Sequence, residues 1–129
     1  LQLDTAWASL IEPQSAEALS IHVPPCTPAY ILYTSGSSGY PKGVCGSHGA
    51  MMNRFSWMWQ QFPFGPEEVA CQKTSYNFLD SVFETFGALA AGVPLVIIPN
   101  AARTDVRYLT NLLAKHRITR LVVVPSLLS

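Results

Sequence analysis

A short segment rich in glycine and hydroxyl side chains contains the residue types that could most clearly do chemistry. Residues 34–43 read Thr-Ser-Gly-Ser-Ser-Gly-Tyr-Pro-Lys-Gly. The glycines let the backbone bend closely around a ligand, and successive backbone N–H groups in such a bend can bind phosphate oxygens. The hydroxyl groups supply further donors, and Lys42 supplies a positive charge. The segment therefore predicts a binding site for the phosphates of a nucleotide.

The spacing of this segment differs from two common phosphate-binding motifs. The P-loop of nucleoside triphosphatases has a Gly-Lys-Ser/Thr triplet, whereas Lys42 follows Pro41 and precedes Gly43. The dinucleotide-binding fingerprint needs three glycines in the pattern G-x-G-x-x-G, and no third glycine stands in phase with Gly36 and Gly39. A glycine-serine linker is the alternative, but linkers rarely follow an apolar strand or contain Pro-Lys-Gly.

The segment from Tyr33 to Gly43 resembles the signature loop of the adenylate-forming superfamily. This superfamily includes acyl-CoA synthetases, luciferases and the adenylation domains of nonribosomal peptide synthetases. Its pattern is roughly Tyr-Thr-Ser-Gly-Ser/Thr-Thr-Gly-x-Pro-Lys-Gly, and Ser38 keeps the hydroxyl group of the usual threonine. The resemblance continues from Ala29 onward, through the residues 44–48, 78–86, 92–99 and 123–126.

The resemblance implies a reaction in two steps. A carboxylate attacks the α-phosphorus of ATP to give an adenylate and pyrophosphate, and a thiol then attacks the activated carbonyl. The loop would bind the β- and γ-phosphates and, with Mg²⁺, neutralise charge on the departing pyrophosphate. The residues expected to bind ATP are Thr34, Ser35, Gly36, Ser37, Ser38, Gly39 and Lys42. Lys42 is also a catalytic candidate.

His48 is the second catalytic candidate, because it occupies the histidine position of the family just before a helix. The resemblance implies that it orders the loop or the site of the acid. The alternative is a histidine whose hydrogen bonds are satisfied by backbone near a helix start.

Leu79 and Asp80 are candidates for binding the substrate. In relatives that activate α-amino acids, an aspartate stands two residues before the position of Ser81 and pairs with the substrate ammonium. Leu79 occupies that place here, and the carboxylate stands one residue later. This displacement suits a β-amino acid such as β-alanine, and Phe83 is expected to line the same pocket. Two alternatives remain: Asp80 stabilises only a helix N-terminus, and Phe83 belongs only to the core.

The hydrophobic pattern predicts an α/β fold with a mainly parallel sheet and flanking helices, as part of the large N-terminal domain of an adenylate-forming enzyme. Residues 1–28 are expected to be a lead-in without regular elements, and residues 29–129 part of the adenylation domain. Ser81 and Glu84 predict a capping box, Thr104 a helix cap and Gly92 a helix end. Strands are predicted at 29–33, 43–47, 69–74, 95–98 and 121–124, and helices at 50–62, 82–91 and after 104.

Composition narrows the function classes. Only 12% of the residues are charged and the net charge is zero, which argues against nucleic-acid binding because basic side chains supply most of that affinity. The sequence has no apolar run long enough for a membrane span. Its three cysteines have no metal-site spacing and predict free thiols in a reducing cytoplasm.

Three parts of the family pattern do not occur in these residues: the adenine-binding Tyr-Gly-x-Thr-Glu segment, the ribose-binding aspartate and the C-terminal lysine. We therefore expect a piece of a longer adenylate-forming ligase, inactive by itself. The expected function is ATP-dependent activation of a carboxylic or amino acid, followed by transfer to the phosphopantetheine thiol of a carrier protein or to CoA. The alternatives are an acyl- or aryl-CoA ligase and a non-catalytic nucleotide-binding or interaction module.

Overall fold

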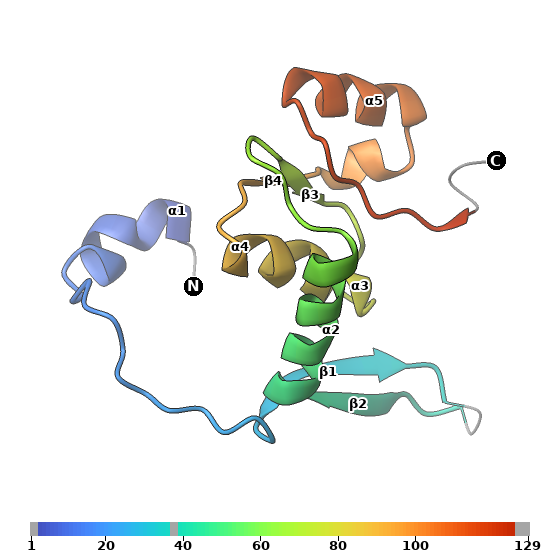
Figure 1. The fold of residues 1–129 in the computed structure, drawn as a ribbon. Helices are drawn as coiled ribbons and strands as arrows, with labels where there is room; N and C mark the ends of the chain where they lie inside the picture. The colour runs from blue at the N-terminus through green and yellow to red at the C-terminus, as the bar shows by residue number, and fades with distance from the viewer. Residues whose placement is uncertain (1–2, 37–38, 126–129) are drawn as a thin grey trace.

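The computed structural model describes residues 3–36 and 39–125. The chain begins with the helical turns α1 (Leu3–Ala6) and η1 (Trp7–Ile11). An extended segment then leads to the rest of the molecule, so these turns lie apart from the hairpin at the bottom of Figure 1. The sequence predicted no regular element before residue 29, and this was wrong for residues 3–11.

An antiparallel hairpin follows, made of β1 (Pro28–Thr34) and β2 (Lys42–Ser47). It forms a sheet of its own, whereas the sequence predicted strands of a mainly parallel sheet. Burial alternates along β1: Tyr30 and Leu32 are half-buried, while Ile31 is 61% and Tyr33 69% exposed. The strand predicted at 29–33 is therefore formed, but this apolar run is only partly buried, on the side where α2 contacts the hairpin.

The helix α2 (His48–Gln61) begins two residues earlier than predicted. Its N-cap is Ser47, whose hydroxyl oxygen accepts a hydrogen bond from the Ala50 N–H at 3.2 Å and satisfies a free donor of the first turn. Phe55 is the buried residue of this helix, and its ring lies edge-on against the Phe83 ring at 5.8 Å. This contact joins α2 to the next helical run.

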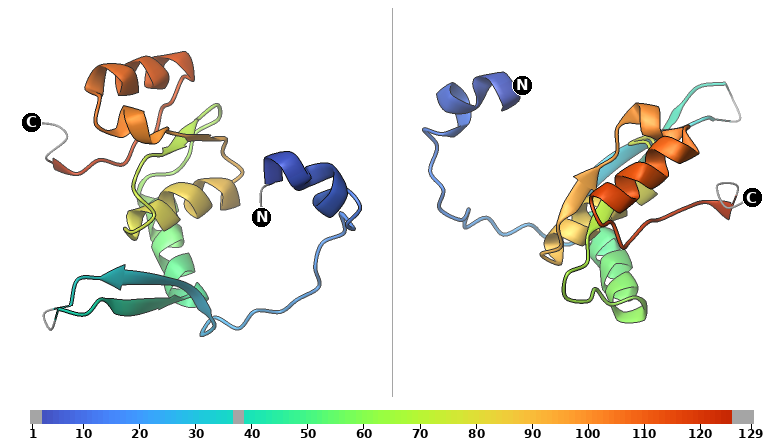
Figure 2. Two further views of the ribbon diagram at one scale, coloured as in Figure 1. Left: turned by 180° about the vertical axis from the view of Figure 1, so that it is seen from behind. Right: turned by 90° about the horizontal axis from the view of Figure 1, so that it is seen from above.

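A parallel strand pair forms the second sheet. β3 (Ala70–Gln72) pairs with β4 (Leu95–Ile97), and the crossover between them is one helical run made of α3 (Asp80–Val82), η2 (Phe83–Gly87) and α4 (Ala88–Ala90). These elements confirm the α/β class, and Figure 2 shows the crossover run from two further sides. The predicted strand at 121–124 is not formed; one parallel bridge, Ala70 to Arg120, lies just before it.

The predicted end of the crossover run is confirmed and its predicted start is wrong. Gly92 has φ +72° and donates to the Leu89 carbonyl at 3.0 Å, while the Val93 N–H donates to the Ala88 carbonyl at 3.0 Å. These two bonds close the helix by the usual glycine-terminated motif. The Ser81–Glu84 capping box is absent, because the Ser81 hydroxyl donates to the Phe78 carbonyl instead.

The last elements are η3 (Asn100–Arg103) and α5 (Val106–Lys115). Asp105 caps α5 by accepting from the Tyr108 N–H at 2.9 Å, so the prediction of Thr104 as the cap was one residue off. α5 packs Leu109, with Leu112 and Leu113, against a core that includes Cys71 and Ile98. Within the described part of the chain, no helix is both long and apolar enough to cross a bilayer.

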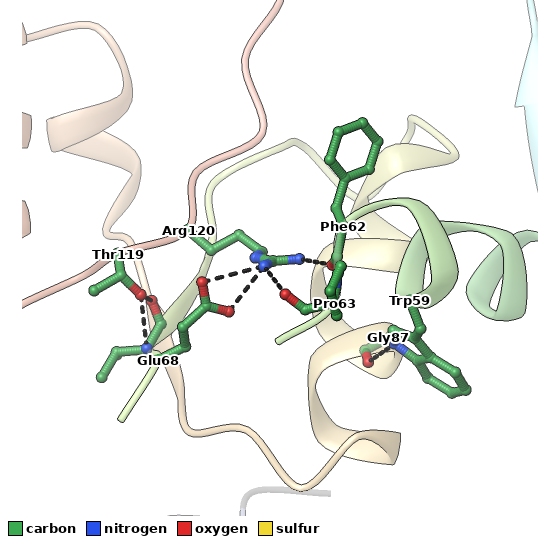
Figure 3. A network of polar contacts seen from close by, with 8 residues as sticks. Trp59, Phe62, Pro63, Glu68, Gly87, Thr119 and Arg120 are labelled. Carbon is green, nitrogen blue, oxygen red and sulfur yellow. Dashed lines mark hydrogen bonds and ion pairs between the residues drawn. The ribbon is translucent and has the colours of Figure 1, made fainter. Parts of the chain in front are cut away.

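Arg120 binds the segment 62–68, which follows α2, next to this core (Figure 3). Its guanidinium donates to the carbonyl oxygens of Phe62 at 2.6 Å and Pro63 at 2.9 Å, and it forms an ion pair with Glu68 at 2.9 Å. The same group stacks on the Phe64 ring, 4.0 Å from its centroid. Arg120 therefore connects the end of α2 to the segment that runs toward the C-terminus.

Candidate functional site

The glycine-hydroxyl loop is the turn of the hairpin. The hairpin register pairs Thr34, the last residue of β1, with Lys42, the first residue of β2. These two residues therefore lie opposite each other where the loop begins and ends. Both side chains are exposed. The strands β1 and β2 extend away from the helices on the side of the loop (Figures 1 and 2). Ser37 and Ser38, two of the expected phosphate ligands, lie outside the described residues.

Two glycines give the loop its shape. The Gly39 N–H donates to the Gly36 carbonyl at 3.0 Å, and Gly39 has φ +83°, a conformation that favours glycine. A Cβ atom on Gly36 would collide with the carbonyl oxygen of Tyr40. Gly36 therefore tolerates no side chain, and its carbonyl is tied to Gly39.

The structure places the other catalytic candidate far from the loop. His48 is the first residue of α2, and its backbone N–H donates to the Thr27 carbonyl at 2.9 Å. The strand β2 separates it from Lys42, and six residues of strand span about 20 Å. Lys42 and His48 thus mark opposite ends of one strand.

The substrate candidates gather at a pocket between the hairpin, α2 and the start of the crossover run. This pocket has a volume of about 270 Å³, and Leu79, Asp80 and Phe83 all line it. Tyr30 and Arg54 line it from β1 and α2. Phe83 is also part of the core through its contact with Phe55, and its role toward a substrate stays a prediction.

Asp80 also faces a second pocket, with a volume of about 310 Å³. One wall is the segment after β3, which includes Lys73, Thr74 and Ser75, and the other wall is the segment 122–124. The carboxylate of Asp80 thus lies between two hollows, where a ligand from either side could reach it.

Sequence reasoning missed Arg54, the charged neighbour of Asp80. Its guanidinium lies 3.7 Å from the Asp80 carboxylate and 6.0 Å from the centre of the Phe83 ring. Arg54 stands 26 residues before Asp80 in the sequence, so no local pattern indicates this pair.

Sequence reasoning also misjudged Glu84. Its carboxylate is buried, with 3% of the residue exposed, and accepts hydrogen bonds from the backbone N–H groups of Lys73 and Thr74. These partners stand ten and eleven residues away in sequence, so no local pattern indicates them.

Comparison with known proteins gives the same family for the whole chain. A family model described as AMP-binding enzyme matches residues 2–129. The chain is 38% identical over 127 residues to the beta-alanyl-bioamine nonribosomal peptide synthetase ebony of Drosophila melanogaster, covering 98% of this chain and 14% of that protein. It is 44% identical over 105 residues to the vanchrobactin synthetase VabF of Vibrio anguillarum, covering 81% of this chain and 4% of that protein.

A solved structure is similar as well. The adenylation domain AlmE of Vibrio cholerae, in complex with glycyl-adenosine-5'-phosphate, matches with a TM-score of 0.68 and 27% identity. The match covers 74% of this chain and 18% of that one. The chain therefore spans a small part of the length of each of these relatives. By its motifs, its fold and the match over residues 2–129, the chain belongs to the AMP-binding enzyme family.

Proposed function

We propose that the chain is the phosphate-binding and acid-binding part of an enzyme that uses ATP to convert an amino acid into its adenylate. The observation that carries the proposal is the hydrogen bond from the Gly39 N–H to the Gly36 carbonyl, next to the paired Thr34 and Lys42. Backbone N–H groups in such a turn can surround phosphate oxygens, and Lys42 adds a positive charge beside them. In this role the loop stabilises charge that develops on pyrophosphate as it leaves.

Mg²⁺ fits this site as a partner of the ATP phosphates. The described residues contain no group of three or more His, Cys, Asp or Glu side chains that could hold a metal ion. Mg²⁺ is usually held by substrate phosphates, water and one or two protein oxygens, and the exposed hydroxyl groups of Thr34 and Ser35 are available at the mouth of the loop. The ion, when bound, supplies charge neutralisation; the chain supplies the orientation of the phosphates.

For the acid, we propose an amino acid whose ammonium pairs with Asp80. Leu79 and Phe83 give an apolar and aromatic lining to the 270 Å³ pocket on one side of Asp80. A carboxylate displaced by one residue suits a β-amino acid, and the similarity to a synthetase named for a beta-alanyl product supports this choice. His48 stands at the hairpin end far from Lys42, so its role would concern the acid and not the phosphates.

The acceptor of the activated acid is proposed to be the phosphopantetheine thiol of a carrier protein, because the relatives include nonribosomal peptide synthetases. All three cysteines of the chain are free, which fits a reducing cytoplasm.

The test is acid-dependent exchange of pyrophosphate into ATP. It requires the complete enzyme, meaning a polypeptide that carries this chain with the adenine-binding and C-terminal segments of the family. We expect exchange with β-alanine and loss of most of it in Asp80→Asn, because the amide cannot neutralise an ammonium. Asp105→Asn is the control, since asparagine also caps a helix and Asp105 lines neither pocket beside Asp80.

Each other outcome has a definite meaning. Equal exchange with propionate, undiminished in Asp80→Asn, would contradict the ammonium site and indicate an acyl-CoA ligase. Binding of ATP and Mg²⁺ without exchange for any acid would contradict the enzyme itself and indicate a nucleotide-binding module.

A further inference from the structure

Glu84 is a buried charged side chain that the proposed chemistry does not use. Its Oε2 atom accepts from the backbone N–H groups of Lys73 at 2.9 Å and Thr74 at 2.8 Å, and its Oε1 atom accepts from the Thr74 hydroxyl at 2.7 Å. Both oxygens act as acceptors, which is what an ionised carboxylate offers. Hydrogen bonds to a charged acceptor are stronger than neutral ones, so Glu84 firmly fixes the chain where β3 ends.

Thr74 is held from a second side as well. The side chain of Gln72 has no exposed surface; its amide nitrogen donates to the Thr74 carbonyl, and its oxygen accepts from Arg103 at 3.3 Å. The hydroxyl, the N–H and the carbonyl of Thr74 are therefore all hydrogen-bonded to buried side chains. Because all of these hydrogen-bonding groups have buried partners, the backbone at the end of β3 is held in one well-defined position.

The segment fixed in this way forms a wall of the pocket beside Asp80. Lys73, Thr74 and Ser75 line that 310 Å³ pocket together with Asp80. Glu84 and Asp80 stand four residues apart in one helical run. The helical run that carries Asp80 therefore also carries Glu84, which fixes the segment 73–75 relative to Asp80.

We propose that Glu84 is a positioning residue for the amino acid: it sets the wall against which the acid lies when its ammonium pairs with Asp80. The inference rests on the proposed function, because it requires the ammonium to pair with Asp80, which lines both pockets; it adds that the rest of the acid lies in the 310 Å³ pocket, whose wall is the segment 73–75. It requires no contact between Glu84 and the substrate. Its effect should be confined to the acid, since the phosphate loop belongs to the hairpin, a separate sheet.

The experiment compares Glu84→Gln with the unchanged complete enzyme in pyrophosphate exchange. Glutamine offers one acceptor oxygen in place of two, so at least one buried donor loses its partner, and we expect KM for β-alanine to rise about tenfold with KM for ATP unchanged. Glu68→Gln is the matched control. It breaks the ion pair with Arg120 and lowers stability, but it should leave both KM values as they are.

A second pair of variants covers the case in which Glu84→Gln does not fold. Thr74→Val removes only the hydroxyl donor to Glu84, and Thr74→Ser keeps it. We expect a raised KM for the acid in the valine variant and a nearly unchanged one in the serine variant. Amide hydrogen exchange at residues 73 and 74 should also be faster in the valine variant.

The outcomes separate the two proposals. An active enzyme in which Glu84→Gln or Thr74→Val leaves KM for the acid unchanged, or raises both KM values equally, overturns the positioning role alone. An unchanged enzyme that shows no acid-dependent exchange overturns the proposed function and the positioning role with it.

Discussion

Arg54 and Asp80 form an ion pair at 3.7 Å where both line the 270 Å³ pocket, with 52% and 48% of their side chains exposed. The pair joins α2 to the first residue of the crossover run. Because both groups remain half in water, their mutual attraction is weak and screened by salt. An incoming ammonium can therefore replace Arg54 as the partner of Asp80 at little cost.

This weak pairing can be measured with a double-mutant cycle of Arg54→Gln and Asp80→Asn. We expect a coupling free energy below about 1 kcal/mol, as for other exposed ion pairs. Urea unfolding of the two single variants and the double variant gives the number. A larger coupling would mean that the pair holds the fold and is not available to a substrate.

Gly36→Ala tests the phosphate loop. A Cβ atom at this position collides with the Tyr40 carbonyl oxygen, so the turn must open. We expect the Kd for ATP with Mg²⁺ to rise at least about tenfold, equivalent to about 1.4 kcal/mol, in calorimetric titration of the complete enzyme. Gly65→Ala is the control, because nothing lies within 4 Å of a Cβ there; equal effects of both variants would rule out the special role of the turn.

Arg120→Met tests the connection between the end of α2 and the C-terminal segment. The substitution keeps much of the apolar length of the side chain but leaves two carbonyl oxygens and Glu68 without their donor. Breaking one side of a largely buried ion pair costs about 3–5 kcal/mol, so we expect a large fall in the free energy of unfolding. The exposed Arg107→Met should change it by less than about 0.5 kcal/mol. Similar values for both would show that Arg120 is dispensable.

Cys71 should behave differently from the other two cysteines. Burial, and next the negative charge of Glu84, raise the pKa of the Cys71 thiol from 9.0 to about 11, whereas Cys26 and Cys45 are exposed. The thiolate is the reactive form, so at pH 8 in the folded protein iodoacetamide should modify only the exposed pair. Mass spectrometry of the digested protein checks this, and modification of all three at one rate would contradict the burial.

The same shift gives stability a pH dependence. The pKa of Cys71 is higher in the folded state, so its contribution to stability is complete below pH 9 and is lost as the pH rises through about 11. We expect the free energy of unfolding in urea to decrease over this range, and to decrease less steeply in Cys71→Ala. Parallel curves for the two proteins would exclude this group as the cause.

Features that depend on neighbouring residues could be predicted from the sequence. The loop at 34–43 was recognisable because glycine, hydroxyl and lysine side chains must stand close together in the chain to surround phosphates. The helix end at Gly92 was predictable because only glycine readily adopts the required positive φ. The α/β class followed from the alternation of apolar runs with helical periodicity.

Only the tertiary structure decided how distant segments meet. The strands β1 and β2 pair in an antiparallel sheet that is separate from the parallel pair. This arrangement depends on the closure of the hairpin and on the packing of α2, and the residue pattern of β1 alone does not indicate it. Glu84 fits a capping box by its spacing, yet the carboxylate instead binds Lys73 and Thr74, because folding brings the end of β3 against the helix. Local propensities fix the local elements, whereas the partners of buried charges depend on which segments exclude water together.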